Sequence, residues 1–373
     1  IYICITMWKT LLGIVIMVSV VSCHSNTAKV TGNVIYVGVS EKADRYLPLS
    51  IAVSEIESVK LSLPLPHFWG IVSEVIAWGD NYFLVDKKQS VAFRFTKGGT
   101  FLNTIGRRGQ GPGEYIEMSS FFVSDSCAYV CDLMSRSIHK YAWDGEYLAT
   151  IHFPYSIVFD DVIALSDDCF LCHRLADDEN GKGLWVMNSE GEIVKRLLEY
   201  KQGTPYVYSD WNTLSMGEDG IARIYNPMSG RFYELDADNG SITEALCLRA
   251  DRNMMDDLIS PTGKEIQEGT RECAYSLFAV NGDHYVLSFW SLTPENKVLW
   301  SIVRKKDKTV YKGVLPRLDI PGYTRMGRPV SSNIPNALVT LYTDEFTPDM
   351  LPNAYKNYVI DEQKAVLSIL KLK

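Results

Sequence analysis

The sequence lacks the features that mark several large classes of protein. It has no cluster of lysine and arginine, and its formal net charge is −8, which argues against binding to a nucleic-acid phosphate backbone. It contains no Gly-Lys-Ser/Thr phosphate loop, no His-Glu-x-x-His zinc motif and no visible serine–histidine–aspartate spacing. Low-complexity tracts and long amphipathic helical patterns are also missing, so strands are left as the main local structure.

Long apolar runs are scarce, and the one run near the N-terminus is short. Residues 11–21 are mostly apolar, a length that suits a signal-peptide core and is too short to span a bilayer. The run ends in Val-Val-Ser-Cys at Cys23, which resembles a bacterial lipobox. We therefore expect a signal peptide within 1–22, with Met7 as the true translation start and residues 1–6 upstream of it, followed by a lipidated Cys23 and a tether over 23–50. An ordinary secretory signal with an incidental cysteine is the alternative.

Glycine recurs at a regular interval in the middle of the chain. Gly99, Gly145, Gly191 and Gly240 follow one another at spacings of 46, 46 and 49 residues. Each glycine ends a short polar turn between two apolar stretches. Strand–turn–strand repeats of this length are typical of propeller blades.

The repeats predict an all-β protein over residues 51–373, a six-bladed β-propeller with four-stranded antiparallel blades around a central channel. The expected blades begin near Val72, Phe121, Val162, Leu214 and Ser276, with a degenerate sixth near Val330. We expect residues 51–63 to supply a strand that completes the last blade and closes the ring. A polar stretch over 251–269 is interpreted as an insertion loop.

A glycine-rich segment joins the first two predicted blades. Residues 105–115 read Ile-Gly-Arg-Arg-Gly-Gln-Gly-Pro-Gly-Glu-Tyr. One interpretation is a tight structural crossover in which Glu114 pairs with Arg107 or Arg108. The other is an anion-binding nest of backbone amides and guanidinium groups at the channel mouth. The candidate ligand-binding residues here are Arg107, Arg108, Gln110, Glu114 and Tyr115.

This segment, the repeats and the lipobox together resemble the six-bladed β-propeller lipoproteins of the Bacteroidota type, which are relatives of the NHL-repeat propellers. The positions that carry the resemblance in the loop are Gly106, Gly109, Gly111, Gly113 and Tyr115. The resemblance implies a bacterial cell-envelope location, as an outer-membrane lipoprotein facing the periplasm. It implies architecture and location more than a reaction.

Three side chains at the ends of predicted second strands are candidate metal ligands. Alternating strand direction puts Asp86, Asp132 and His173 on the same side of the disc as the glycine-rich crossover. Such a group can hold a divalent metal such as calcium or serve as acid and base. The alternative is that the two aspartates cap their own turns.

The cysteines do not predict a haem site. Cys169, Cys172 and His173 form a Cys-x-x-Cys-His pattern, but residues three apart on a strand point to opposite faces. The same spacing excludes a disulfide within the pair. Longer-range disulfides, Cys131 with Cys172 or Cys247 with Cys273, stay open.

Aromatic residues cluster before the fourth predicted blade. The cluster holds Tyr200, Tyr206, Tyr208 and Trp211. Exposed rings of this kind suit the stacking of a sugar or peptide. Packing between blades is the alternative explanation.

Together these patterns predict a monomeric, membrane-anchored binding protein with no cofactor. Its partner is expected to be a protein, or a saccharide or peptide ligand, bound on the channel face. The rival hypothesis is an NHL-like or lactonase-like lyase or hydrolase that uses a metal at the channel mouth. A third possibility is a structural spacer that holds envelope proteins together.

Overall fold

The computed structural model describes residues 35–39, 44–175, 183–200, 212–226, 231–250, 271–279, 283–292, 298–323, 325–346, 349–359 and 361–373. These residues form strands and turns, with two short 3-10 helices, η1 (Leu49–Ile51) and η2 (Asn353–Tyr355). Within these ranges, no helix has both the length and the apolar character needed to cross a membrane.

The strands form antiparallel sheets in which neighbours in sequence are neighbours in space. The first sheet contains β4 (Glu74–Trp78), β5 (Asn81–Asp86), β6 (Val91–Thr96) and β7 (Phe101–Ile105). The second contains β8 (Ser120–Val123), β9 (Cys127–Asp132), β10 (Ser137–Ala142) and β11 (Tyr147–His152). The third contains β12 (Asp161–Ser166), β13 (Cys169–Arg174), β14 (Gly183–Asn188) and β15 (Ile193–Glu199).

The next two sheets each gain a strand from the N-terminal part of the chain. One contains β16 (Leu214–Met216), β17 (Ile221–Asn226), β18 (Arg231–Asp236) and β19 (Ile242–Ala250). The other contains β20 (Arg271–Ala279), β21 (His284–Leu292), β22 (Val298–Arg304) and β23 (Thr309–Arg317). β1 (Ile35–Val39) adds in parallel to β19, and β2 (Asp44–Pro48) adds in parallel to β23. The predicted tether over 23–50 is therefore corrected: part of it pairs along the outer edges of two sheets.

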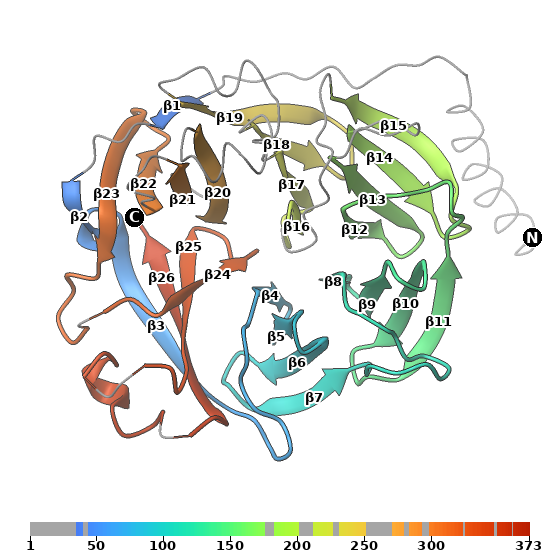
Figure 1. Cartoon of the computed structure of the whole chain (residues 1–373), viewed down its shortest axis with the longest axis horizontal. Coiled ribbons are helices and arrows are strands. Elements are labelled where there is room, and N and C mark those ends of the chain that lie inside the picture. Colours follow the sequence, from blue (N-terminus) through green and yellow to red (C-terminus); the bar gives the residue numbers. More distant parts are fainter. Residues whose placement is uncertain are drawn as a thin grey trace, which may run out of the picture.

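The last group of strands is completed from the N-terminal side, as predicted. It contains β24 (Arg328–Ser332), β25 (Ala337–Tyr342), β26 (Lys364–Leu372) and β3 (Val53–Ser62). β3 pairs with β26 along its whole length, from Ser62 opposite Lys364 to Val53 opposite Leu372. A short parallel contact of β24 with β4 then joins this group to the first sheet. The sheets surround a common centre, and β4, β8, β12, β16 and β24 lie nearest to it (Figure 1).

The alternating strand directions give the disc two distinct faces. The chain crosses from one sheet to the next at the face that also carries the turns after β5 and β9; we call this the crossover face. Three bonds at the first crossover establish its position: the hydroxyl of Tyr115 donates to the carbonyl of Ser90, the amide of Met118 contacts the Ser90 hydroxyl, and the amide of Ile116 donates to Asp132. The opposite face, which carries the turns after β4, β8 and β12, is called the turn face.

The four repeated glycines occupy equivalent turns. Gly99, Gly145, Gly191 and Gly240 each lie between the third and fourth strands of a sheet, with φ between 69° and 91°. L-residues with a side chain rarely adopt this conformation. The glycine period therefore reports a backbone requirement that each sheet repeats.

The core lies between the faces of neighbouring sheets. Phe83 of β5 contacts Phe121 of β8, with ring centroids 5.9 Å apart, and Tyr129 of β9 contacts Phe170 of β13 at 5.8 Å. The second strands β5 and β9 are buried at every position. Their continuous apolar pattern follows from being covered on both sides.

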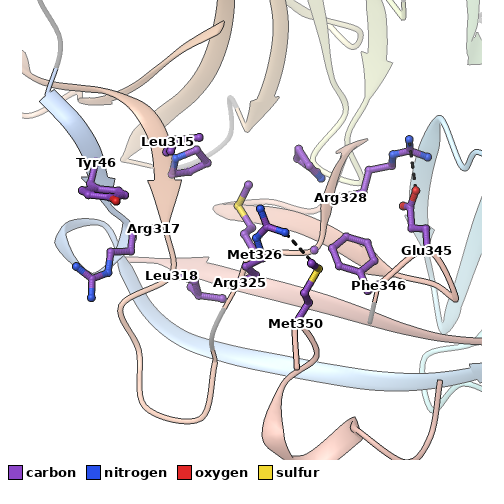
Figure 2. Close-up of a pocket in the computed structure, with 13 residues that line it drawn as sticks. Tyr46, Leu315, Arg317, Leu318, Arg325, Met326, Arg328, Glu345, Phe346 and Met350 are labelled. Carbon is purple, nitrogen blue, oxygen red and sulfur yellow. Dashed lines mark hydrogen bonds and ion pairs between the residues drawn. The ribbon is translucent and has the colours of Figure 1, made fainter. Parts of the chain in front are cut away.

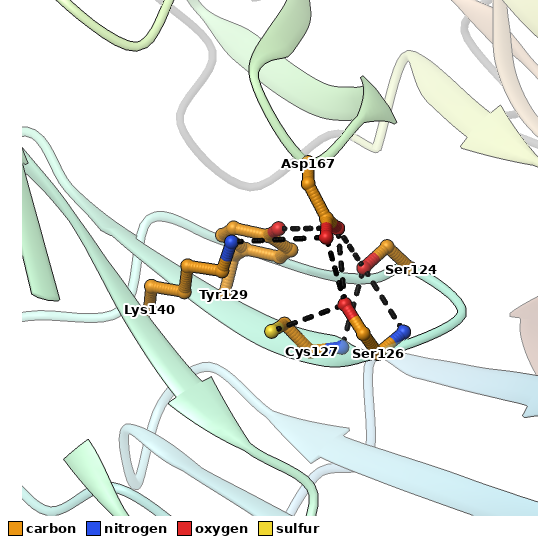
Figure 3. A network of polar contacts seen from close by, with 6 residues as sticks. All are labelled: Ser124, Ser126, Cys127, Tyr129, Lys140 and Asp167. Atoms are coloured by element: carbon orange, nitrogen blue, oxygen red, sulfur yellow. Dashed lines mark hydrogen bonds and ion pairs between the residues drawn. The ribbon is translucent and has the colours of Figure 1, made fainter. Parts of the chain in front are cut away.

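A polar staple joins the second and third sheets at the turn face (Figure 3). Asp167, in the turn after β12, accepts hydrogen bonds from the hydroxyls of Ser124 (2.8 Å), Ser126 (2.9 Å) and Tyr129 (3.1 Å). Burial alone raises the pKa of Asp167, but these bonds and the nearby charge of Lys140 outweigh it and lower the pKa. The first and second sheets are joined in the same way, since the indole of Trp78 donates to Asp125 at 3.0 Å.

Candidate functional site

The glycine-rich crossover folds around its own glutamate. The Glu114 carboxylate accepts a hydrogen bond from the amide of Gly111 at 2.8 Å and pairs with Arg107 at 2.5 Å. The Gly111 amide, followed by the charge of Arg107, lowers the pKa of Glu114. The loop thus takes the predicted form of a structural crossover in which Glu114 pairs with an arginine, and the Glu114 carboxylate occupies the Gly111 amide that the anion-nest interpretation would leave for a ligand. Of the two pairings predicted for Glu114, the structure has the one with Arg107.

The glycines are needed because side chains crowd the loop. A Cβ atom on Gly109 would lie 2.0 Å from the Glu114 carboxylate, and one on Gly113 would lie 2.5 Å from the ring of Tyr147. Gly113 also has a φ of +71°. The absent side chain at Gly109 makes room for the carboxylate, and the one at Gly113 makes room for the Tyr147 ring.

The other candidate residues of this loop have different environments. Arg108 and Gln110 are exposed, and the backbone of Arg108 bridges to Tyr115. Tyr115 is buried, with 1% of its surface exposed, and burial raises the pKa of its hydroxyl. Tyr115 is therefore a core residue that fastens the crossover to the turn after β5.

A cavity of about 430 Å³ adjoins the loop. It is lined by Arg107 and Glu114 from the loop, by Thr104 of β7, and by Tyr141 and Tyr147 of the second sheet. β7 and β11 are the outer strands of their sheets. The guanidinium of Arg107 thus lies toward the rim of the disc, which corrects the predicted position at the channel mouth.

The two candidate aspartates organise turns on the crossover face. Asp86 accepts hydrogen bonds from the backbone amide and the side-chain amide of Gln89, at 2.9 and 2.8 Å. Asp132 accepts from the amides of Ile116, Met134 and Ser135. Both aspartates are fully buried. They take the turn-capping role that was the alternative to metal binding.

His173 lies apart from these carboxylates in a closed set of hydrogen bonds. Its Nδ1 pairs with the hydroxyl of Thr213 at 2.7 Å, and its Nε2 pairs with the hydroxyl of Tyr200 at 2.9 Å. Burial lowers the pKa of His173 to about 3, so the imidazole is neutral at physiological pH. In the part of the chain that the structure describes, no three histidine, cysteine or carboxylate side chains form a group that could hold a metal ion.

The described residues include only part of the predicted aromatic cluster and of the predicted disulfide pairs. Tyr200 packs edge-on against His173, but Tyr206, Tyr208 and Trp211 lie outside the described residues. Cys131 and Cys172 are buried free thiols, so the structure contradicts a disulfide between them. The side chain of Cys273 is also outside the described part, and the alternative pair with Cys247 stays a prediction.

Sequence reasoning missed two buried carboxylates at the centre. Asp161 accepts bonds from the hydroxyl of Ser120 (2.7 Å) and from the amides of Thr213 (2.8 Å) and Leu214 (2.9 Å), which joins β8, β12 and β16. The sequence does carry a signal, because an acidic residue followed by Val-Ile-Ala begins both β4 and β12, at Glu74 and Asp161.

Glu74 belongs to a polar bridge across the centre of the disc. Burial raises its pKa to about 8, while the charge of Lys87 and a hydrogen bond from Asn212 act in the opposite direction. Lys87 in turn donates to the side-chain carbonyl of Asn212 at 2.6 Å. On the other side of the hub, the amide of Asn333 donates to the carbonyls of Ala77 and Met216, both at 3.0 Å. Polar side chains thus span the region that the sequence predicts as a channel.

The crossover face also carries exposed apolar side chains that the sequence did not predict. The fractions of their surface that are exposed are 45% for Phe68, 46% for Ile71, 40% for Ile116, 67% for Met134 and 87% for Tyr155. Asp132 holds the backbone of both Ile116 and Met134. Arg136, in the turn of Met134, lies over the ring of Tyr155 at 4.8 Å. The buried carboxylate therefore sets the position of an apolar surface.

A ring of antiparallel sheets with a polar centre defines this protein as a β-propeller. The chain belongs to the family described as "Domain of unknown function (DUF4934)", whose model matches residues 33–368. No curated protein sequence matches the chain.

Solved structures share the fold at low sequence identity. A Bacteroides fragilis protein that is named for its expected export has a TM-score of 0.69 and 16% identity, covering 91% of this chain and 100% of that one. A member of the DUF4221 family from Bacteroides vulgatus has a TM-score of 0.51 and 11% identity, covering 86% and 98%. Virginiamycin B lyase from Staphylococcus aureus has a TM-score of 0.43 and 10% identity, covering 85% and 100%, a similarity too weak to support a functional comparison.

Proposed function

We propose that this protein is a lipid-anchored propeller of the bacterial cell envelope that binds a protein partner, or a saccharide or peptide ligand, on its crossover face. It acts as a monomer and needs no cofactor. The observation that carries the proposal is the exposed apolar surface on that face. Large exposed apolar patches mark interaction sites, and the five exposed apolar side chains named above all lie on this one face.

The propeller in this proposal has six blades. Hydrogen bonding links eight strands into one sheet, in the order β3-β26-β25-β24-β4-β5-β6-β7. Only two residue pairs, between β24 and β4, join its two four-stranded halves. Counting these halves as separate blades makes six groups around the hub. The glycine-rich crossover, with Gly106, Gly109, Gly111 and Gly113, supports an NHL-like repeat.

The N-terminal sequence supports the proposed location. Residues 11–21 and the Val-Val-Ser-Cys segment suit a lipoprotein signal, with the mature protein on the periplasmic side of the outer membrane. We expect Cys23→Ser to abolish incorporation of radiolabelled palmitate and to move the protein into the aqueous phase of a detergent partition. A cleaved protein that carries no lipid label with Cys23 intact would instead indicate an ordinary secretory signal.

The rival lyase or hydrolase needs convergent acid, base or metal ligands. Asp86 and Asp132 are occupied by turn amides, and His173 is occupied by two hydroxyl groups. The geometry of these three residues therefore favours binding over catalysis.

The binding proposal is tested by photo-crosslinking in the native cells. Met134→Asp places a charge in the apolar surface, and we expect it to reduce capture of the main crosslinked partner at least tenfold. Leu148→Asp is the matched control, because Leu148 is 47% exposed on the outer strand β11. Equal capture by the Met134 variant and the control would rule out this face as the binding surface.

A further inference from the structure

A larger cavity, of about 940 Å³, is built by residues of the β23–β24 region and of the segment after β25 (Figure 2). It opens between the end of β23 and the start of β24, next to the turn that follows β25. Its lining is mixed, with an apolar part that includes Leu318, Met326, Pro329, Phe346 and Met350. The volume falls within the range of about 300–1,000 Å³ that is typical of small-molecule sites.

Of the four charged side chains that line the cavity, Arg325 contacts its apolar part. Arg325 comes from the segment between β23 and β24, and its Nη1 donates to the sulfur of Met350 at 3.2 Å (Figure 2). A thioether is a weak acceptor, whereas a carboxylate accepts two parallel, charge-assisted bonds from a guanidinium group. The position next to Met350 is therefore one where a ligand anion binds better than the group now present.

The neighbouring carboxylate does not fill that role. Glu345 is the carboxylate that lines the cavity among the described residues, and it is directed to Arg328, with 3.7 Å between nitrogen and oxygen. Figure 2 shows this pair to one side of Arg325. Three guanidinium groups, those of Arg317, Arg325 and Arg328, thus line the cavity with one carboxylate, in a chain whose formal net charge is −8.

The lining also suits a ligand with an apolar body. Methionine side chains at positions 326 and 350 are unbranched and adapt to the shape of what they contact. Phe346 adds a flat ring that packs edge-on against Tyr342 at 5.2 Å, which holds it in place at the cavity wall. Burial of an apolar body here supplies affinity, and the guanidinium sets the orientation.

We propose that this cavity is a binding site for a small amphipathic carboxylate. The carboxylate pairs with Arg325, displacing the contact with Met350, and the apolar body lies against Leu318, Met326 and Phe346. This site is separate from the apolar surface around Met134 and does not depend on the function proposed for that surface.

The test uses the purified full chain and a fluorescent probe, 1-pyrenebutyrate, beside its neutral amide. We expect a dissociation constant on the order of 10 µM for the acid, and binding of the amide at least tenfold weaker because it lacks the charge. Arg325→Gln keeps hydrogen-bonding capacity but removes the charge, so it should bring the two constants together. Because the Arg325 side chain is exposed, the variant should keep the unfolding midpoint of the parent.

Two controls make the result specific. Arg196→Gln removes one positive charge from an exposed position on β15, and it should leave both constants unchanged. Phe346→Leu should weaken binding of acid and amide alike. Equal affinity of the parent for acid and amide, no saturable binding, or an Arg325→Gln variant that keeps the preference for the acid would each overturn the proposal.

Discussion

The carboxylate of Glu114 fills the nest that the glycine-rich loop builds. An internal anion has no translational freedom to lose, so a free anion must compete with a partner that is always present. This explains how a loop with the composition of an anion site can be a structural crossover. The exposed guanidinium groups of Arg107 and Arg108 nevertheless remain at the surface beside it.

The buried imidazole of His173 leads to a prediction for how the free energy of unfolding depends on pH. Its pKa is about 3 in the folded protein, because burial disfavours the imidazolium, and about 6.5 when unfolded. The unfolded state therefore binds the extra proton between these values, and the free energy of unfolding falls as pH drops from about 6.5 toward 3. The loss from this residue is about 5 kcal/mol over the whole interval.

The measurement is urea unfolding between pH 7 and pH 4.5. His173→Gln has no titrating imidazole, so its stability should decline less steeply, by up to about 1.4 kcal/mol per pH unit. Its stability at pH 7 should be lower than that of the parent because the bonds to Thr213 and Tyr200 change. Parallel curves for variant and parent would show that His173 is not the group responsible.

The roles of some of these buried polar residues could be predicted from their neighbours in the sequence, and the roles of others could not. The caps made by Asp86 and Asp132 follow from an aspartate at a strand end, since Gln89 and Met134 lie three and two residues away. Asp161 accepts bonds from residues 41 to 53 positions away. Its role depends on three inner strands meeting at the hub, which local chemistry does not encode.

At the scale of elements, the turns after β8 and β12, the first strands of the second and third sheets, each bind the preceding sheet. Asp167 is the clearest case, because it accepts three hydroxyl groups from the preceding sheet. We expect Asp167→Asn to lower the free energy of unfolding by about 1 kcal/mol, since its side chain is partly exposed and its bonds are screened by solvent. Because its folded pKa is lowered, the difference should shrink as pH falls through that pKa.

The adjacent residue provides the control for this prediction. Asp168 is exposed in the same turn, and Asp168→Asn makes the same change in charge. Its urea midpoint should match that of the parent at pH 7. A similar loss for both variants would indicate an effect of net charge and not of the staple.

At the scale of the whole molecule, β3 links the beginning of the sheet ring to its end. Leu61 of β3 lies opposite Ala365 and is fully buried in the cluster with Val339 and Leu367. We expect Leu61→Ala to lower the free energy of unfolding by about 2–5 kcal/mol, from the lost apolar contact and the cavity left behind. The measurement is the urea midpoint.

Shortening an exposed aliphatic side chain to alanine is the control for the loss of a buried one. Val194 of β15 is 55% exposed, and Val194→Ala should change the midpoint little. If Leu61→Ala were as mild as this control, β3 would contribute little to holding the ring closed.

The sequence alone determined the blade repeat, the turns at its glycines and the strand that closes the last sheet, because periodicity and backbone conformation are local properties. Tertiary structure decided what the polar residues do. It used Asp161 to join three inner strands, paired Lys87 with Asn212 across the hub, and left Met134 and Tyr155 exposed on the same face. These contacts join residues far apart in the chain, and their energies depend on burial and neighbours that appear when the sheets are packed.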